Sequence, residues 1–440
     1  MSRTLSWSAA AVLGIAVLFL LVRNSLAIPV LVPLDPNEGW NAAHALALRA
    51  GHGLYPSPQS LMVNNYPPLS FYPVAFLTGW TGDAVIAGRA LALLSFLADC
   101  ALIAALTRRM GAGMPGRILA PLFFAGILLI ASDYVGMNDP QLLGHALQLA
   151  ALLLLLRERV IAAALIFAAS LFIKHNLLAL PAAAAIFLWQ QDRRAGLRFT
   201  ACGLVAGGVG LLLFQQFYGF SLWTVLSTPR QASWDNLRHG VANLWWALLP
   251  MGVLIGMRGP WKRFCLIYAL VALAFGLAFS AGDGVDANAF FDLAIALSLA
   301  LGLAAESKAV LAPLSAVALL GFLALNFHDN NFYYTRDIAA QSARDIAFLK
   351  SRPGPVLCDQ LSLCLWAGKG AEVDAFNIGE QIKTGNRSPA GLVDMIAAHH
   401  FAVVQLQDLD SLGPSVRAAL TKNYRLERND DDGAFFTPAL

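Results

Sequence analysis

Long apolar stretches constrain this chain more than any other feature. A helix needs about 20 apolar residues to cross a bilayer, and this criterion predicts eleven spans in the 440 residues. They lie near 8–27, 84–107, 117–132, 140–156, 159–173, 176–190, 199–217, 241–257, 263–280, 289–305 and 309–326. Only 13% of the residues are charged, against roughly 25% in soluble domains. The sequence therefore predicts a mainly α-helical, polytopic membrane protein rather than a water-soluble enzyme.

Charge and cysteine content exclude other classes of protein. Lys plus Arg is 30 and Asp plus Glu is 27, a net charge of +3, which gives no reason to expect a nucleic-acid partner. Five cysteines are too few for a disulfide scaffold or a zinc array. The first stretch ends in Ser25-Leu26-Ala27, which resembles a signal-peptide cleavage site. Because that stretch is long for a signal peptide and Arg23 precedes the site, we expect an uncleaved anchor.

The basic residues predict the orientation of the chain. With the N-terminus in the cytoplasm, the loops on that side hold thirteen Lys and Arg residues, and the opposite loops before residue 327 hold four. Short cytoplasmic loops are enriched in Lys and Arg. We therefore expect a cytoplasmic N-terminus, and an odd number of spans places the C-terminal tail outside.

Acidic residues gather in the loops on the outer side. Asp35 and Glu38 lie in the first outside loop, at 28–83, and further acids are Asp133, Asp139, Asp283, Asp286 and Asp292. Acids contribute little to topology, so they are not an insertion signal. Solvated loop carboxylates explain one or two of them. Asp139 and Asp292, which stand at the ends of spans, are better explained by a shared outside-facing site.

The first outside loop is too long for a plain connector. Asp35 followed by Pro36 is typical of a helix N-cap, and 37–50 has the apolar spacing of a short amphipathic helix. The aromatic, proline-rich stretch 64–73 then predicts a re-entry toward the bilayer. Aromatic residues also collect at membrane interfaces for lipid reasons alone, so Tyr66 and Tyr72 fit either interface packing or a site.

The order of these motifs resembles the GT-C superfamily of membrane glycosyltransferases, such as the protein O-mannosyltransferases and the lipid A aminoarabinose transferases. The resemblance covers about 1–330 and rests on acids after the first span, the Gly51–Pro56 turn, Tyr66–Leu69, Asn138-Asp139-Pro140, Phe172–Asn176 and Gly282–Asp292. The first loop is short and lacks the long basic cluster of better-known members, which leaves donor and acceptor open.

The resemblance implies transfer of a sugar from a polyprenyl-phosphate donor on the outer face of a bacterial inner membrane. The acceptor is a hydroxyl or amine of a glycan, glycolipid or protein. The residues implied are Asp35 as general base with Glu38 second; Lys174, Arg49, Arg89 and His175 for the donor phosphate; and Tyr55, Tyr66, Tyr72, Asp133, Asn138, Asp139, Asn288 and Asp292 around the substrates.

Several alternatives stay open beside this interpretation. Lys174 also fits a lysine that reaches to the interface, and Arg49 fits a charge at a helix C-terminus. No cofactor is expected, but Asp35 with Asp133 or Asp139 would suit a divalent ion. A transporter or flippase of a lipid-linked substrate is the competing function. It predicts inverted repeats and mid-membrane charges, and the sequence shows neither.

From about 327 the composition changes. Residues 1–326 form the predicted membrane domain, and 327–440 hold eleven Lys and Arg, fourteen Asp and Glu, and no apolar span. Apolar strands at 355–358 and 401–406, helices at 335–351 and 389–398, and a final hairpin from 424 predict a small α/β domain outside the membrane. Cys358 and Cys364 fit either a disulfide or two buried thiols.

Overall fold

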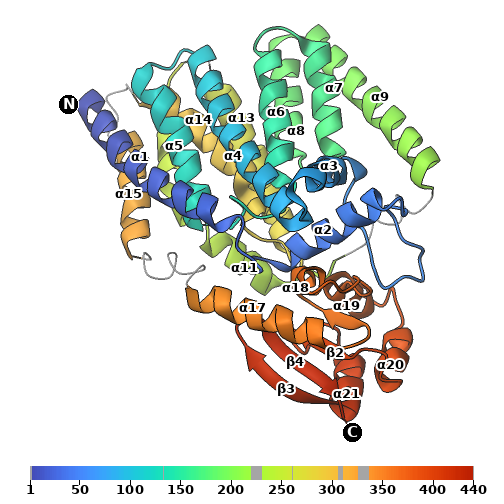
Figure 1. Ribbon diagram of the computed structural model, residues 1–440. Helices are drawn as coiled ribbons and strands as arrows, with labels where there is room; N and C mark the ends of the chain where they lie inside the picture. Colours follow the sequence, from blue (N-terminus) through green and yellow to red (C-terminus); the bar gives the residue numbers. More distant parts are fainter. Residues whose placement is uncertain are drawn as a thin grey trace.

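Helices form most of the molecule, and a small sheet lies near its C-terminus (Figure 1). The computed structural model describes residues 2–131, 133–219, 230–259, 261–305, 311–325 and 336–439. Each of the eleven predicted spans falls on a helix or a bent pair of helices. These are α1 (Ser2–Ala27), α4 (Ala84–Arg109), α5 (Met114–Ala131), α6 (Gln141–Leu155), α7 (Val160–Leu171), α8 (Ala179–Gln191), α9 (Arg193–Tyr218), α11 with α12 (Trp234–Ala242 and Leu248–Gly256), α13 (Lys262–Ser280), α14 (Phe291–Ala304) and α15 (Leu311–Leu325).

Length separates these helices into two groups. Within the described ranges, five helices and one bent pair are long and apolar enough to cross a membrane, whereas α5, α6, α7 and α15 are shorter apolar helices. The chain is thus a multi-pass membrane protein, and the count of eleven spans stays a prediction. The apolar stretch ending in α14 is 83% buried and that of α9 is 6% buried, so α14 lies inside the bundle and α9 at its edge.

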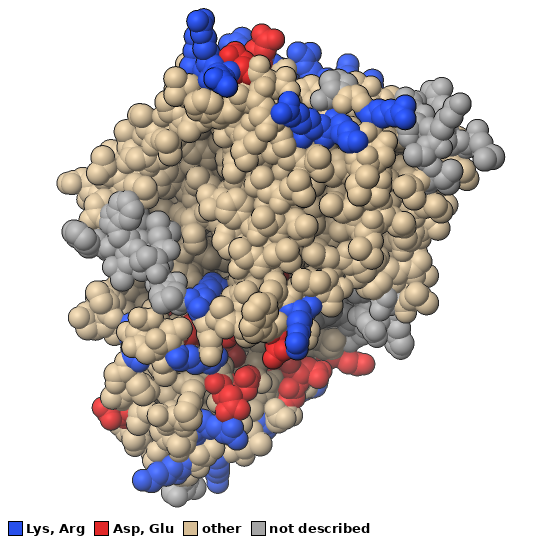
Figure 2. Space-filling view, turned by 180° about the vertical axis from the view of Figure 1, so that it is seen from behind, with Lys and Arg blue, Asp and Glu red and all other residues tan. Residues whose placement is uncertain are grey.

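Charged side chains mark the two ends of the bundle. Figure 2 shows a broad band of uncharged side chains between a rim of mostly Lys and Arg and a lower part where both signs mix. An uncharged belt of this kind is what a bilayer requires of the surface it covers.

Two helices lie in the loop that was predicted to re-enter. They are α2 (Pro36–Arg49) and α3 (Phe71–Thr81); the first was predicted and the second was not. Glu38 of α2 and Arg89 of α4 are fully buried, and their side chains pair through two contacts of 2.7 Å. This two-pronged pair fixes α2 against the start of α4.

The C-terminal part folds as the predicted α/β unit. Its sheet has the order β1-β2-β4-β3, with β1 (Val356–Cys358) parallel to β2 (Val403–Leu406) and β4 (Gly433–Pro438) antiparallel to β2 and β3 (Tyr424–Asp430). Helices α17 (Arg336–Ser351) and α20 (Ala390–Ala397) were predicted, and a further short helix, α18 (Leu361–Trp366), follows β1. Helices α19 (Ala375–Lys383) and α21 (Pro414–Asn423) were not predicted. The domain boundary at 326/327 lies outside the described residues.

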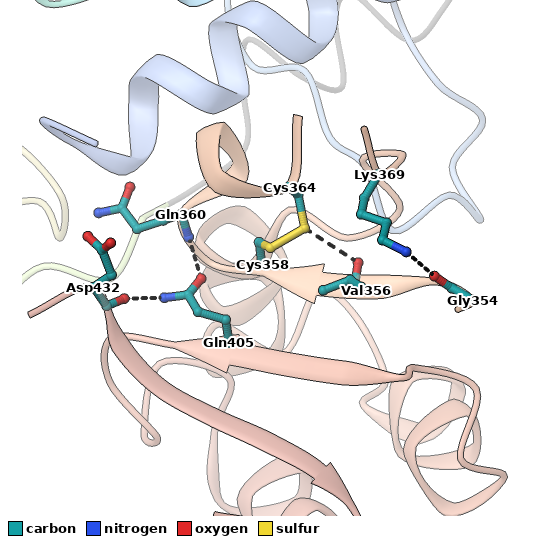
Figure 3. The surroundings of a disulfide bond; sticks show 8 residues. All are labelled: Gly354, Val356, Cys358, Gln360, Cys364, Lys369, Gln405 and Asp432. Atoms are coloured by element: carbon teal, nitrogen blue, oxygen red, sulfur yellow. Dashed lines mark hydrogen bonds between the residues drawn. A yellow bond between two sulfur atoms is a disulfide. The ribbon is translucent and has the colours of Figure 1, made fainter. Parts of the chain in front are cut away.

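Cys358 and Cys364 form a disulfide, which resolves the alternative left open above. It joins the end of β1 to α18 (Figure 3). Beside it, the Gln405 side chain accepts from the Gln360 amide at 2.9 Å and donates to the Asp432 carbonyl at 2.6 Å. The start of α18 is therefore tied to the sheet by covalent and polar links.

Helix α18 in turn packs directly on α2. A Cβ placed on Gly39 would lie 2.1 Å from the Ser362 amide nitrogen, so only glycine allows this approach of the two backbones. Trp366 donates its indole N–H to Asp83 at 2.8 Å, and Asp83 also caps α4. The C-terminal unit is thus docked on the same helices that carry the Glu38–Arg89 pair.

Candidate active site

A cavity of about 660 Å³ lies between the C-terminal unit and the ends of the apolar helices, a size typical of ligand pockets. The polar and aromatic residues that line it are Asp35, Asn37, Trp40, Asn65, Tyr66, Tyr134, Lys174, His175, Asn176, Arg230, Phe279, Asp286, Asn288, Asp359, Asp374, Phe376 and Asn377. Five of the predicted site residues are among them: Asp35, Tyr66, Lys174, His175 and Asn288.

Asp35 is placed by the N-cap that the sequence predicted. Its side chain accepts from the Asn37 amide at 2.8 Å and is half-buried against the cavity. Burial raises the pKa of Asp35 from 3.8 to about 6, helped by the negative charges of Asp139 and Glu38 and opposed by the Asn37 hydrogen bond. A carboxylate with this pKa is ionised at neutral pH and still binds a proton readily, as a general base must.

Lys174 lies in the loop between α7 and α8 and faces the cavity. Its ammonium contacts both oxygens of Asp139, at 2.8 and 3.0 Å, and lies 5.0 Å from the ring centre of Tyr66. Burial lowers the pKa of Lys174, but Asp139 and Tyr66 outweigh burial, so the pKa is raised and the amine stays protonated. Three residues that were predicted separately, Lys174, Asp139 and Tyr66, are therefore brought together.

Arg230 is a second cation of the cavity, and it was not predicted as a site residue. It donates to the Asp283 carbonyl at 3.0 Å, and its guanidinium lies 5.6 Å from the ring centre of Phe376. Within the described ranges, no carboxylate lies within 4.0 Å of it. Its charge is therefore less neutralised than that of Lys174.

Glu38 and Arg89 occupy a different place from the one predicted. Both are fully buried, and Arg89 also donates to the carbonyls of Val30 and Val32. Neither lines the cavity. The prediction of Glu38 as second base and Arg89 as phosphate ligand is therefore corrected: their charges satisfy each other in the interior. Asn138 belongs to this cluster, since its side chain donates to the Glu38 carbonyl at 3.1 Å.

Other predicted residues lie away from the cavity. Arg49 is exposed at the far end of α2, about 21 Å along the helix from Asp35. Tyr55 donates to the Tyr66 carbonyl at 2.9 Å, and exposed Tyr72 contacts the hydroxyl of Tyr218. The list is completed by two acids: Asp133, which is exposed, and Asp292, which accepts from Tyr268 at 2.6 Å inside the bundle. The cavity is not lined by any of the five predicted residues of this paragraph: Arg49, Tyr55, Tyr72, Asp133 and Asp292.

The C-terminal unit supplies a wall that sequence reasoning missed. Asp374 caps α19, and burial raises its pKa to about 6. Asn377 accepts a hydrogen bond from the Asn65 side chain across the junction at 2.8 Å. Asp359 accepts from the Gln407 amide with one oxygen. The only local signal was the pattern of a helix cap at Asp374, which does not indicate a partner 300 residues earlier.

The described residues contain no group of three His, Cys, Asp or Glu side chains placed to hold a metal ion. The cavity does hold carboxylates on both walls, at Asp35 and Asp359. The cations that face them are Lys174 and Arg230, so positive charge is available from side chains.

Comparison with protein-family models and with curated proteins finds no match. Two solved structures of ArnT from Cupriavidus metallidurans match over nearly their full length. The chain covers 97% of the structure bound to undecaprenyl phosphate, with 97% of this chain matched, 14% identity and a TM-score of 0.61. The apo structure matches with the same coverage and identity and a TM-score of 0.58. The resemblance to GT-C membrane glycosyltransferases is thus confirmed at the level of the fold.

Proposed function

We propose that this protein transfers a sugar from a polyprenyl-phosphate donor to an acceptor hydroxyl or amine. The observation that carries the proposal is the cavity in which half-buried Asp35, with a pKa of about 6, shares the lining with Lys174 and Arg230. The shared fold with a structure described as bound to undecaprenyl phosphate supports a lipid-phosphate donor.

The chemistry assigns one role to each charge. Asp35 takes the proton of the acceptor while the acceptor oxygen or nitrogen bonds to the anomeric carbon. The bond from that carbon to the phosphate oxygen breaks, and the electron pair leaves with the polyprenyl phosphate. Lys174 and Arg230 stabilise the negative charge that grows on this phosphate. A single displacement of this kind inverts the anomeric centre.

The proposal divides the two cations by their surroundings. Lys174 is buried and held by Asp139, so we assign it to orientation of the phosphate and of Tyr66. Arg230 is half-buried and stacked on Phe376, and its planar donors suit a phosphate. We therefore assign the larger share of phosphate binding to Arg230.

The site's surroundings are part of the same proposal. We place the N-terminus in the cytoplasm of a bacterium and the C-terminal unit on the periplasmic or extracellular side of the inner membrane. That orientation follows from the thirteen to four distribution of Lys and Arg. It puts the cavity where sugars must arrive on a lipid, because nucleotide sugars and ATP are absent there.

A transfer assay on purified protein tests the proposal. Radiolabelled polyprenyl-phosphate sugars are offered with extracted membrane lipid and glycan, and release or transfer of sugar is measured for wild type, Asp35→Asn and Arg230→Ala. Arg238→Ala is the matched control, because Arg238 is 81% exposed on α11 and pairs with Asp235. A parallel reaction with EDTA tests the expectation that no metal is required.

We expect transfer from one donor class, loss in Asp35→Asn, weaker donor use in Arg230→Ala and no effect of Arg238→Ala. Absence of transfer from every donor by folded wild type, together with movement of the donor across proteoliposome membranes, would instead support the transporter or flippase alternative.

A further inference from the structure

A second hollow lies at the opposite end of the bundle from the candidate active site. It has a volume of about 760 Å³ and is lined by residues of α4, α5 and α6 and the turn that follows α6. The start of α4 contacts the C-terminal unit through Asp83, and the 26 residues of α4 span about 39 Å. Arg108 and Arg109, at the other end of α4, are therefore far from the cavity around Asp35.

Four arginines converge on this hollow: Arg108, Arg109, Arg117 and Arg157. Arg117 donates to the Ala112 carbonyl at 2.8 Å, and Arg109 reaches the Leu156 carbonyl at 3.4 Å. Among the described residues none of the four lies within 4.0 Å of a carboxylate. Some exposed arginines elsewhere are paired, as Arg417 is with Asp410. Four uncompensated guanidinium groups around one hollow favour an anion between them.

The rest of the lining is apolar. Between the arginines lie Ala104, Ala105, Ile118 and Leu153, which are half-buried, and Met114, which is 55% exposed. The two alanines leave the space that larger side chains would fill. A hollow with a basic rim and an apolar floor, at the end of membrane helices, matches a molecule with an anionic head and hydrocarbon chains.

The positive-inside rule alone does not account for this arrangement. It explains why cytoplasmic loops carry Lys and Arg, but it is equally satisfied by Arg193 and Arg194 at the start of α9, which do not line this hollow. The distinguishing feature is that arginines from three separate segments of the chain face one hollow.

We propose that this hollow, called the groove from here on, binds an anionic phospholipid of the surrounding bilayer. Its phosphate lies among the four guanidinium groups, and its acyl chains run along the apolar floor toward the membrane. Basic pockets between membrane helices on the cytoplasmic side suit such headgroups. The proposal does not depend on the reaction at Asp35.

Binding has a direct consequence for the helices that build the active site. The lipid contacts the far ends of α4 and α6, while α4 carries Arg89 near its start and α6 follows Asp139. A lipid held across both helices stabilises their relative position. We therefore expect the phospholipid to raise the melting temperature of the full-length protein.

The test compares lipid binding to the intact protein and to two variants by native mass spectrometry and by thermal unfolding in a zwitterionic detergent. The groove variant is Arg108→Gln with Arg157→Gln, chosen because neither side chain has a hydrogen-bond partner in the described part of the chain. The matched control is Arg193→Gln with Arg194→Gln. Phosphatidylglycerol, phosphatidylcholine and a polyprenyl phosphate are each added alone.

We expect phosphatidylglycerol to bind wild type and control alike and to raise their melting temperatures. Binding to the groove variant should be about 30-fold weaker, from about 5-fold for each arginine near an anionic headgroup. Equal binding to groove variant and control overturns the proposal. So does equal retention of phosphatidylcholine, or a greater loss of polyprenyl phosphate than of phosphatidylglycerol in the groove variant. If the groove variant fails to fold, the salt dependence of wild-type binding decides: affinity must fall as salt rises, and salt-independent binding refutes an ionic site.

Discussion

Replacing Asp35 with Asn separates catalysis from folding more cleanly than any other change at this site. Asn keeps the side-chain oxygen that accepts from the Asn37 amide, and Asn and Asp are about equally good helix N-caps. What Asn lacks is the ability to take a proton. We therefore expect turnover to fall by about 10²- to 10⁴-fold, the usual contribution of a general base.

The same substitution should not destabilise the protein. The pKa of Asp35 rises from 3.8 to about 6 on folding, so at neutral pH the ionised carboxylate lowers stability by at most about 3 kcal/mol, at 1.36 kcal/mol per pK unit. Because Asp35 is only half-buried, solvent reduces this penalty. Asn removes the penalty and retains the cap, so the free energy of unfolding should stay equal or increase.

The stability of the protein should depend on pH through Asp35. Between about pH 4 and pH 6 the folded protein holds a proton on Asp35 that the unfolded chain has released, so this group's contribution to stability falls as pH rises. The melting temperature of Asp35→Asn minus that of wild type should therefore grow over this range. Wild-type turnover should rise through about pH 6 as Asp35 ionises.

Transfer assays and thermal unfolding in detergent, both measured from pH 4.5 to 8, test these statements together. Turnover of Asp35→Asn equal to wild type would refute the assignment of the base. A marked fall in its melting temperature would refute the reasoning about the cap, since the loss of activity would then report unfolding.

Three further changes test other parts of the structure. Glu38→Gln leaves Arg89 buried without its carboxylate and should destabilise the protein by about 3–5 kcal/mol; an unchanged melting temperature would contradict the buried pair. Arg230→Ala should raise the KM for the lipid donor about 10- to 100-fold, from loss of a charged hydrogen bond, with the melting temperature unchanged; loss of kcat alone would argue against phosphate binding in the ground state. Cys358→Ser with Cys364→Ser opens a disulfide of sequence separation 6 and should lower stability by about 2 kcal/mol, measured against wild type with and without reductant; identical unfolding of all three samples would show that the bond does not stabilise the fold.

The parts of the fold that depend on local pattern were predictable. Apolar length located the helices of the bundle, and the Asp35-Pro36 pair located the start of α2 to the residue. The predicted strands of the C-terminal unit also form, because short β-branched and apolar runs bounded by turns specify strands locally.

The composition of the cavity was only partly predictable, because it is set by docking between distant segments. Asp35 and Lys174, predicted as general base and phosphate ligand, do line the cavity, but the same reasoning placed Glu38 and Arg89 beside them. Nothing in the sequence shows that these two charges, 51 residues apart, neutralise each other in the interior. Asp374 and Asn377 belong to the C-terminal unit, which packs on α2 at Gly39. A close approach of two backbones has no periodic pattern by which it could be recognised in the sequence.

The junction between α2 and α18 also governs when the site first exists during synthesis. Asp35 is made early, but the opposite wall, from Asp359 to Asn377, is made after more than 300 further residues. Until that last segment folds against Gly39, the carboxylate stands on an open surface in contact with water. A nascent or truncated chain therefore holds the predicted base but no enclosed cavity. On the proposed function, an unfinished copy of the protein therefore lacks the enclosed cavity in which transfer would take place.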